Sequence, residues 1–349
     1  MPINIELLRR LCETPGIASQ EDAMRTLVKA ELATLVDDIS VDAMGSVVGL
    51  KRGAGQRRVM IAAHTDEIGF IVKYIDDDGF LRIHNVGGFD PRTLVAQRVW
   101  VHSARGGALL GALMPETKPI HVLGADEIKP PKLDDFFVDL GMTAAGVKAL
   151  VDIGDMVTLE GEVREVGDCV MSKAMDDRVG VFVMIEALRQ LRSHEVDILA
   201  VATSQEEVGL RGAMTAAYGL KPDIGIALDV TLAIDTPGQG KQHAVSRLRS
   251  GVAIKLMDSS LICHPRLVRH FRDIAEQAGI PHQLEIMPRG GTDGGAIQRS
   301  RAGVPSITIS VPTRYVHSVD ELVAVADVEA TISLLARYLE EAHLRDYSL

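Results

Sequence analysis

Polar side chains that can bind a metal ion or carry a proton follow four apolar runs of the sequence. The runs are "VMIAA", "DILAVA", "IGIAL" and "SITIS", and they have the composition of short buried strands. An open α/β sheet places its functional site at the carboxyl ends of its strands. One such strand end would mean little, but four together predict a shared site. The candidate residues are His64, Asp66, Glu206, Glu207, Asp229 and His317.

Each of these residues also has an ordinary structural explanation. A histidine after a strand is more often a loop residue than a ligand, adjacent glutamates often form the solvated start of a helix, and an aspartate can cap a helix. Taken together, two histidines and several carboxylates without a thiolate suit zinc, cobalt or manganese in a catalytic site. They do not suit a closed structural zinc site.

The spacing of these residues suggests different roles for neighbours. The carboxylate of Asp66 can hydrogen-bond to the imidazole of His64 and fix its tautomer. Glu206 and Glu207 point in different directions from an extended backbone, so one can bind metal while the other acts as a base. Two cations about 3.5 to 4 Å apart also need a bridging carboxylate, and "KAMDDRVG" offers two aspartates for this role. These aspartates are Asp176 and Asp177, and the chemistry alone does not choose between them.

The chain changes character twice along its length. Residues 5–35 carry apolar residues at helical spacing, and two short strands, "SVVGL" and "RRVMIAAH", follow. Between about residues 71 and 163, turn signals such as "DDDG", "NVGG" and "SARGG" separate short strands, and "TAAGVKALV" predicts one short helix. Strands then alternate with helices. The expected elements are helix 179–191, strand 196–203, helix 210–218, strand 224–228, helix 265–279, strand 306–310 and a final helix from about Leu322.

This pattern predicts an α/β fold, in which an open mixed α/β sheet with helices on both faces is interrupted by a small inserted β-rich domain, PDZ-like or β-barrel-like. We expect residues 1–70 and 164–349 to form the catalytic domain and residues 71–163 to form an inserted dimerisation domain. The segment "GGTDGGA", residues 290–296, lacks the Lys-Ser/Thr of a P-loop. We expect it to form a tight turn near the site, with Asp293 in a structural role.

Composition limits the possible partners and the location. The chain has 349 residues with 37 Lys and Arg against 48 Asp and Glu, and its net charge of −11 argues against binding to nucleic acid or to an anionic membrane. No signal-peptide pattern and no run long enough for a membrane span is visible in the sequence. The three cysteines, Cys12, Cys169 and Cys263, indicate no disulfide framework, which fits a reducing cytoplasm.

Six motifs together resemble those of a known enzyme family. They are "AAHTDEIGF", "KAMDDRVG", "SQEEVGLRGA", "ALDVT", "PRGGTDGGA" and "PTRYVHSVDE". Their order and separations resemble those of the dinuclear-metal glutamyl and deblocking aminopeptidases, which include the tetrahedral, TET-type aminopeptidases. The resemblance extends over essentially the whole chain.

The resemblance implies a role for each candidate residue. It implies that His64, Asp176 and Asp229 hold one metal ion, and that Asp176, Glu207 and His317 hold the other. Asp176 is then the bridge, a choice over Asp177 that only the resemblance makes. Glu206 would be the general base, and Asp66 would orient His64.

The resemblance also implies an activity, a cofactor and an assembly. The expected enzyme is a cytoplasmic dinuclear metalloaminopeptidase, a hydrolase and exopeptidase that removes N-terminal residues from short peptides. Its cofactor would be two divalent ions per subunit, zinc in the first place, with cobalt or manganese as options. Subunits would pair through the insert and assemble as a homo-oligomer, a hollow dodecamer. No residue of the sequence is assigned to the pocket that selects the N-terminal side chain.

Three other functions remain open at this stage. The chain can be a metal-binding assembly subunit without peptidase activity, or a related two-zinc deacylase or carboxypeptidase. In those relatives the extra domain usually enters after the position of Asp229, whereas here about 90 β-rich residues separate Asp66 from Asp176. A glycoside hydrolase based on Glu206 and Glu207 is disfavoured, because adjacent residues seldom place two carboxyls about 5 to 9.5 Å apart across one bond.

Overall fold

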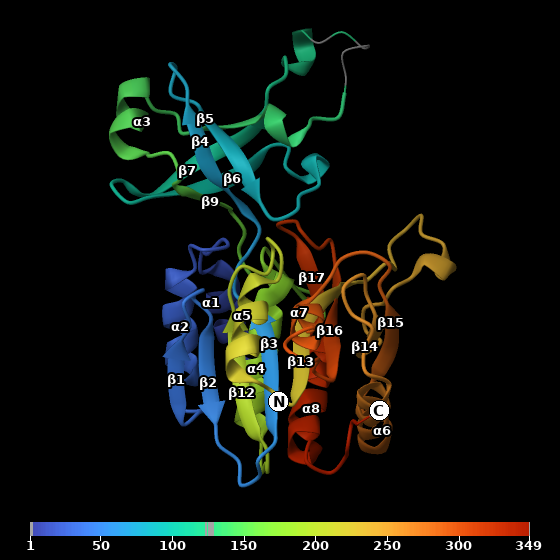
Figure 1. Ribbon diagram of the computed structural model, residues 1–349. Coiled ribbons are helices and arrows are strands. Elements are labelled where there is room, and N and C mark those ends of the chain that lie inside the picture. Colours follow the sequence, from blue (N-terminus) through green and yellow to red (C-terminus); the bar gives the residue numbers. More distant parts are fainter. Residues whose placement is uncertain (1–2, 123, 125–128, 349) are drawn as a thin grey trace.

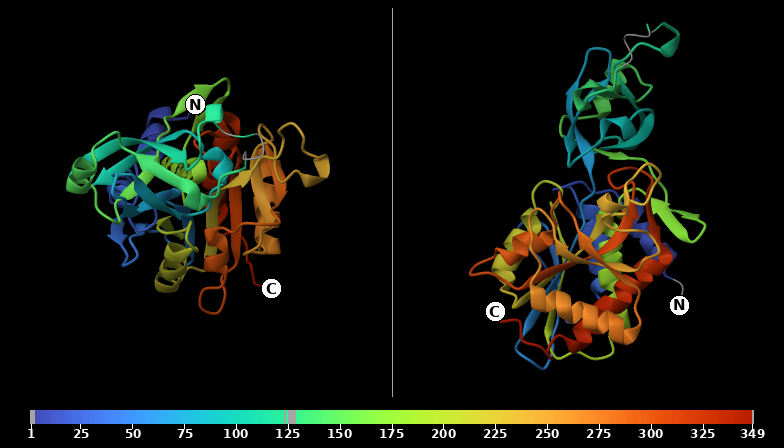
Figure 2. Two further views of the ribbon diagram at one scale, coloured as in Figure 1. Left: turned by 90° about the horizontal axis from the view of Figure 1, so that it is seen from above. Right: turned by 90° about the vertical axis from the view of Figure 1, so that its right-hand side faces the viewer.

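The computed structural model describes residues 3–122, 124 and 129–348. In these residues the chain forms a large mixed β-sheet with helices on both faces and a smaller closed β-barrel that stands over one edge of the sheet (Figure 1). The side view in Figure 2 shows the barrel apart from the larger body and joined to it by a narrow connection. The expected fold class, with its barrel-like insert, is therefore confirmed.

The large sheet is built on four parallel central strands. Its strands are β1 (Asp38–Val41), β2 (Val47–Lys51), β3 (Arg58–His64), β10 (Arg164–Val166), β11 (Cys169–Ser172), β12 (Asp197–Thr203), β13 (Ile224–Leu232), β14 (Val252–Met257), β15 (His282–Ile286), β16 (Ser306–Arg314) and β17 (Glu321–Ala324). Their order is β1-β2-β12-β3-β13-β16-β17-β11-β10, and β14 pairs with both β16 and β15. The parallel strands β12, β3, β13 and β16 end at the same edge of the sheet.

Helices cover the sheet on both sides. They are α1 (Ile5–Glu13), α2 (Asp22–Leu32), α4 (Met175–Gln190), α5 (Arg211–Leu220), α6 (Pro265–Ala278), α7 (Asp293–Gln298) and α8 (Val325–Glu341). The short η5 (Lys241–His243) lies in a loop that projects from the body (Figure 1). In β3, Val59, Ile61 and Ala63 belong to one buried cluster, while Met60 and Ala62 belong to another. Successive side chains of a strand point to opposite faces, so α4 and α8 pack over the first cluster and α5 and α7 over the second. Both faces of β3 are buried under helices, so the residues between its two ends are apolar on both faces. This explains the unbroken apolar run before His64.

The barrel has its own hydrophobic core. Its elements are β4 (Gly69–Ile75), β5 (Leu81–Val86), β6 (Gln97–Ser103), β7 (Gly107–Pro115), β8 (Phe136–Asp139), β9 (Met156–Leu159), α3 (Ala144–Leu150), η1 (Pro91–Thr93), η2 (Ile120–Val122) and η4 (Leu133–Asp135). The strand order β4-β5-β8-β7-β6-β9 closes because β9 pairs with β4. Phe70, Val99 and Val157 are among the buried residues inside it. A Cβ atom at Gly69 would lie 2.8 Å from the carbonyl oxygen of Val157, so this closure requires glycine.

Most expected elements agree with the structure to within a few residues. The final helix needs a correction, because it begins at Val325 and not near Leu322. Residues Glu321–Ala324 instead form β17, which pairs with β11 and β16. The proposed domain boundaries at residues 70/71 and 163/164 stay a prediction.

The described helices were also compared with the dimensions of a lipid bilayer. Within residues 3–122, 124 and 129–348, none of them combines the length and the apolar character needed to span it.

Candidate active site

The fold brings the candidate residues together at one edge of the sheet, beneath the barrel. His64 is the last residue of β3, and it lies opposite Thr203, the last residue of β12, in the parallel register. Glu206 and Glu207 follow in the loop after β12, and Asp229 lies within β13. The remaining candidates come from the start of α4 and the loop between β16 and β17, namely Asp176 and His317.

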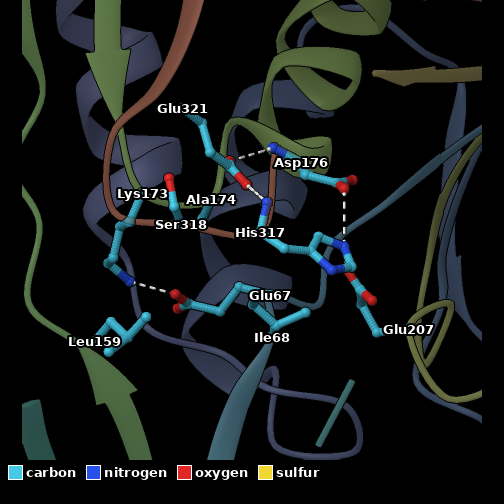
Figure 3. Close-up of a pocket in the computed structure, with 10 residues that line it drawn as sticks. All are labelled: Glu67, Ile68, Leu159, Lys173, Ala174, Asp176, Glu207, His317, Ser318 and Glu321. Carbon is cyan, nitrogen blue, oxygen red and sulfur yellow. Dashed lines mark hydrogen bonds and ion pairs between the residues drawn. The ribbon is translucent and has the colours of Figure 1, made fainter. Parts of the chain in front are cut away.

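Asp176 lies at the centre of this group. Its Oδ1 is 3.0 Å from Nε2 of His64, and its Oδ2 is 3.3 Å from Nε2 of His317. Nε2 of His317 is also 3.3 Å from Oε1 of Glu207 (Figure 3). One carboxylate therefore contacts both imidazoles, as a bridging ligand must.

One group of possible ligand atoms among the described residues consists of His64, Asp176 and Glu207. One atom from each residue lies within 4.8 Å of the others, so these three form a possible metal site. This group combines members of both expected ligand sets around Asp176. Asp229 is outside the group, but its buried carboxyl lines the same cavity as His64 and Asp176.

The two adjacent glutamates have different surroundings. The carboxylate of Glu207 contacts His317, whereas no hydrogen bond to the carboxylate of Glu206 is found among the described residues. Oε2 of Glu206 lies 3.9 Å from Nε2 of His64, and the side chain faces the cavity. Glu206 is therefore free to exchange a proton with a bound molecule.

Asp66 holds the site together through two different groups. Its backbone carbonyl lies 2.9 Å from Nδ1 of His64, and a carbonyl can only accept, so Nδ1 carries a proton and Nε2 points at Asp176. Its carboxylate lies 3.6 Å from the same Nδ1 and accepts hydrogen bonds from the backbone amides of Glu206 and Glu207, at 2.9 and 3.1 Å. Asp66 thus fixes His64 and both glutamates at once.

Asp177 faces away from the cluster that Asp176 joins. Its Oδ2 accepts a hydrogen bond of 3.2 Å from the backbone amide of His64, and its Oδ1 accepts one of 3.1 Å from the amide of Gly180. The side chain is fully buried. Its oxygens therefore hold the backbone in place and are not directed at the imidazoles.

Glu321 belongs to the site but was not among the expected residues. It is buried at the start of β17, where it accepts hydrogen bonds from the backbone amides of Asp176, at 3.0 Å, and His317, at 2.6 Å (Figure 3). His317 has a φ of +65°, so its loop is tightly bent and needs such support. The only signal in the sequence is an acid four residues after His317 in "HSVDE".

Asp293 has the structural role that was expected, but the expected turn over residues 290–296 needs a correction, because helix α7 begins at Asp293. Asp293 is buried at the first turn of α7, and its Oδ2 accepts a hydrogen bond from the hydroxyl of Thr203 at the end of β12. Gly290 has a φ of +88°, which is the conformation that favours glycine in a tight turn.

The electrostatics of the cluster favour a bound cation. Among the described residues, no Lys or Arg forms an ion pair with Asp66, Asp176, Glu206, Glu207 or Asp229. Burial raises the pKa of Glu206, Glu207 and Asp229, and like charges nearby raise them further. Such a crowd of buried carboxyls is costly unless positive charge compensates it.

The two histidines compensate part of this negative charge, because the carboxylates around them raise the pKa of both imidazoles. Burial alone would lower the pKa of His317, but its hydrogen bonds with Asp176 and Glu207 raise it to about 12. Burial likewise acts to raise the pKa of Asp176, yet the two histidines outweigh it and the pKa falls. Nε2 of each imidazole faces the carboxylate of Asp176, which is where a divalent cation would supply positive charge instead. The donor set therefore fits metal ions.

Comparison with known proteins agrees with this site. Residues 45–334 match the family described as M42 glutamyl aminopeptidase, and the chain belongs to that family. The family consists of aminopeptidases, which are hydrolases. Lysyl aminopeptidase of Pyrococcus furiosus is 35% identical over 99% of each chain.

Two solved structures share the whole fold. An aminopeptidase from the archaeon Desulfurococcus kamchatkensis is 41% identical, with a TM-score of 0.92 over 97% of this chain and 94% of that one. The TET1 peptidase of Pyrococcus horikoshii is 32% identical, with a TM-score of 0.86 over 97% and 99% of the two chains. That peptidase is described as assembling into a tetrahedron or a large octahedral shell.

Proposed function

We propose that the protein is a dinuclear metal-dependent aminopeptidase that removes N-terminal residues from short peptides. The observation that carries this proposal is the group of buried and half-buried imidazoles and carboxylates, which meets at a cavity and has no Lys or Arg ion-pair partner within the described residues. His64, Asp176 and Asp229 would hold one ion, and Asp176, Glu207 and His317 the other. Zinc suits these ligands, with cobalt or manganese as alternatives.

The chain's own residues have separate tasks in hydrolysis. When bound, the metal ions would act as Lewis acids on the scissile carbonyl and make water easier to deprotonate. Glu206 takes a proton from the attacking water and then gives it to the peptide nitrogen as the carbon–nitrogen bond breaks. Its carboxylate, which accepts no hydrogen bond from the described residues and lies 3.9 Å from Nε2 of His64, supports this role. Asp66 keeps Nε2 of His64 directed into the site and holds the backbone of Glu206 in place.

The proposal extends to substrate size, location and assembly. The cavity beside the cluster has a volume of about 740 Å³, which suits a short peptide segment. Three free, buried cysteines are consistent with a cytoplasmic protein. The likeness to a TET peptidase that forms closed shells supports pairing through the barrel and a hollow dodecamer.

Removal and return of metal tests the proposal directly. Dialysis against a chelator should abolish hydrolysis of a panel of aminoacyl chromogenic substrates, and added zinc, cobalt or manganese should restore it. Elemental analysis should find about two ions per chain in the restored protein. Full activity after verified metal removal would overturn the mechanism, and metal binding without hydrolysis of any substrate would favour an assembly subunit.

Tests with blocked peptides separate the two-zinc relatives. A deacylase acts on an N-acylated amino acid, and a carboxypeptidase needs a free C-terminus. Hydrolysis that requires a free α-amino group, and that proceeds when the C-terminus is an amide, is the expected result.

A further inference from the structure

The cavity beside the metal-site residues is lined by two charged groups that the proposed mechanism does not use. Apart from the candidate ligands and Glu206, the charged side chains that line it are Asp90 and Arg289. Most of the other lining side chains are apolar, among them Phe89, Val230 and Met287. A charge in such a setting influences which substrates bind.

Asp90 is already neutralised by a neighbour. Its Oδ2 pairs with the guanidinium of Arg92 at 2.5 Å, and its Oδ1 accepts a hydrogen bond from the Arg92 backbone amide at 3.0 Å. Arg289, in contrast, forms no hydrogen bond or ion pair with any of the described residues. The unpaired charge of the cavity wall outside the metal site is therefore positive.

The backbone on both sides of Arg289 is fixed although its side chain is free. The amide of Met287 donates to the carbonyl of Met257 at 3.0 Å, and the Met287 side chain is buried. The carbonyl of Gly290 accepts a hydrogen bond of 3.1 Å from the amide of Ser259. A fixed loop that carries a free guanidinium needs little reordering when it binds an anion.

We propose that Arg289 binds a carboxylate of the peptide substrate and thereby determines substrate preference. This inference rests on the proposed aminopeptidase function, and it specifies that the group recognised by the cavity is a carboxylate. A guanidinium can hold a carboxylate through two parallel hydrogen bonds. A substrate ammonium group at the same place would instead meet a like charge.

Two parts of a short peptide can supply this carboxylate. One is the side chain of an N-terminal Glu or Asp, and the other is the C-terminal carboxylate of a di- or tripeptide. Family membership does not decide the preference, because the relative from Pyrococcus furiosus is named for lysyl substrates.

Four dipeptides separate the two sources. They are Glu-Ala, Gln-Ala and the C-terminal amides of both, and kcat/KM is measured for each with the metal-loaded wild type, Arg289→Gln and Arg289→Lys. Arg269→Gln is the matched control, because Arg269 is an exposed arginine of α6 that does not line the cavity. Thermal unfolding shows that each variant is folded.

The expected result is a wild-type preference for one kind of carboxylate that falls roughly tenfold in Arg289→Gln, since a hydrogen-bonded charge pair is lost. Arg289→Lys should keep part of the preference, and Arg269→Gln should keep all of it. If Arg289→Gln lowers the ratio of kcat/KM for Glu-Ala to that for Gln-Ala, the carboxylate is that of the N-terminal side chain. If Arg289→Gln lowers the ratio of kcat/KM for the free acids to that for the C-terminal amides, the carboxylate is that of the C-terminus. Equal ratios in wild type and Arg289→Gln would overturn the inference.

Failure of the inference differs from failure of the proposed function. If the metal-loaded wild type hydrolysed no aminoacyl substrate, the proposed function would fall. Calorimetric titration of the same four peptides into the Glu206→Gln variant still tests Arg289 in that case. Tighter binding of the peptide that carries the additional carboxylate, lost in Glu206→Gln/Arg289→Gln, would support the inference, and equal binding would refute it.

Discussion

Glu206 and Glu207 are consecutive in the chain, yet the structure gives their carboxylates different neighbours. Glu207 contacts His317 at 3.3 Å, while Glu206 lies 3.9 Å from His64. Both backbone amides donate to the carboxylate of Asp66. The buried Asp66 thus holds the backbone of both glutamates in place, and their side chains point in different directions from it.

Exchanging each glutamate for glutamine should therefore give different defects. Glu206→Gln keeps the size of the side chain but cannot accept a proton, so kcat should fall by roughly 10² or more while metal content persists. Glu207→Gln should lower the occupancy of one metal ion. Elemental analysis and kinetics on both purified variants give the answer, and the opposite pattern would exchange the two roles.

Asp176 and Asp177 offer a second matched pair. Asp176→Asn should lose metal and activity, because the carboxylate that contacts both histidines is gone. Asp177→Asn should keep most of its metal and instead lower the free energy of unfolding by about 1–3 kcal/mol, because a buried acceptor of two backbone amides is altered. Metal analysis and thermal unfolding distinguish these outcomes. Equal metal loss in both variants would contradict the assignment.

Among single residues, the sequence predicts those that have a reactive side chain and also stand at the end of an apolar run. His64, Asp229 and His317 could be found because each follows an apolar run of the sequence. Glu321 could not, because it contacts only backbone amides and a single acid in a loop has no such pattern. The hydrogen bonds that Asp66 accepts from two amides could not be predicted from the sequence either, since they depend on β3 and β12 lying side by side.

The helices and strands around the site position its residues through contacts at their termini. β17 enters the sheet beside β16, and its first residue, Glu321, holds the start of α4 and the loop of His317 by their backbones. Two expected ligands of one ion thereby keep a fixed separation.

Glu321→Gln should loosen this connection, because an amide group would face one of the two backbone donors. We expect metal affinity to fall by about tenfold or more, with the fold retained. Glu165→Gln, on the exposed strand β10, is the matched control and should bind metal as the wild type does. Metal titration of the chelator-treated proteins measures the effect, and unfolding in chelator checks the fold. Wild-type affinity in Glu321→Gln would show that the connection is dispensable.

Sequence patterns identified elements with strong periodicity and missed those that depend on their partners. The central strands and the long helices could be predicted because each is apolar on the face or faces that it buries. The short strands β14, β15 and β17 could not, since their pairing is set by distant segments. "ELVAVADV" carries β17 directly into α8, and its apolar residues fit a helix as well as a strand.

On the scale of the whole molecule, the barrel contributes cavity-lining residues such as Phe89 but none of the expected ligands. Its outer surface carries exposed apolar side chains, including Leu110 and Met114 of β7. Such a surface suits contact with another subunit.

We expect light scattering to report a large particle for the intact protein, and a much smaller one after residues 71–163 are replaced by a short linker. Particle size is the readout, because the deletion also removes part of the cavity wall. Circular dichroism establishes that the remaining body is folded. A monodisperse monomer with full peptidase activity at micromolar concentration would contradict the proposed assembly and leave the metal site untouched.

The order of the site residues along the chain has a consequence for biosynthesis. His64 leaves the ribosome before the whole barrel, whereas His317 and Glu321 are made only after the barrel and after strands β12 and β13. Domains fold as units, earlier segments first, so the barrel can fold while the catalytic body is still incomplete. A nascent chain therefore has no complete set of the expected ligands until the segment that carries His317 has been made, well after the barrel.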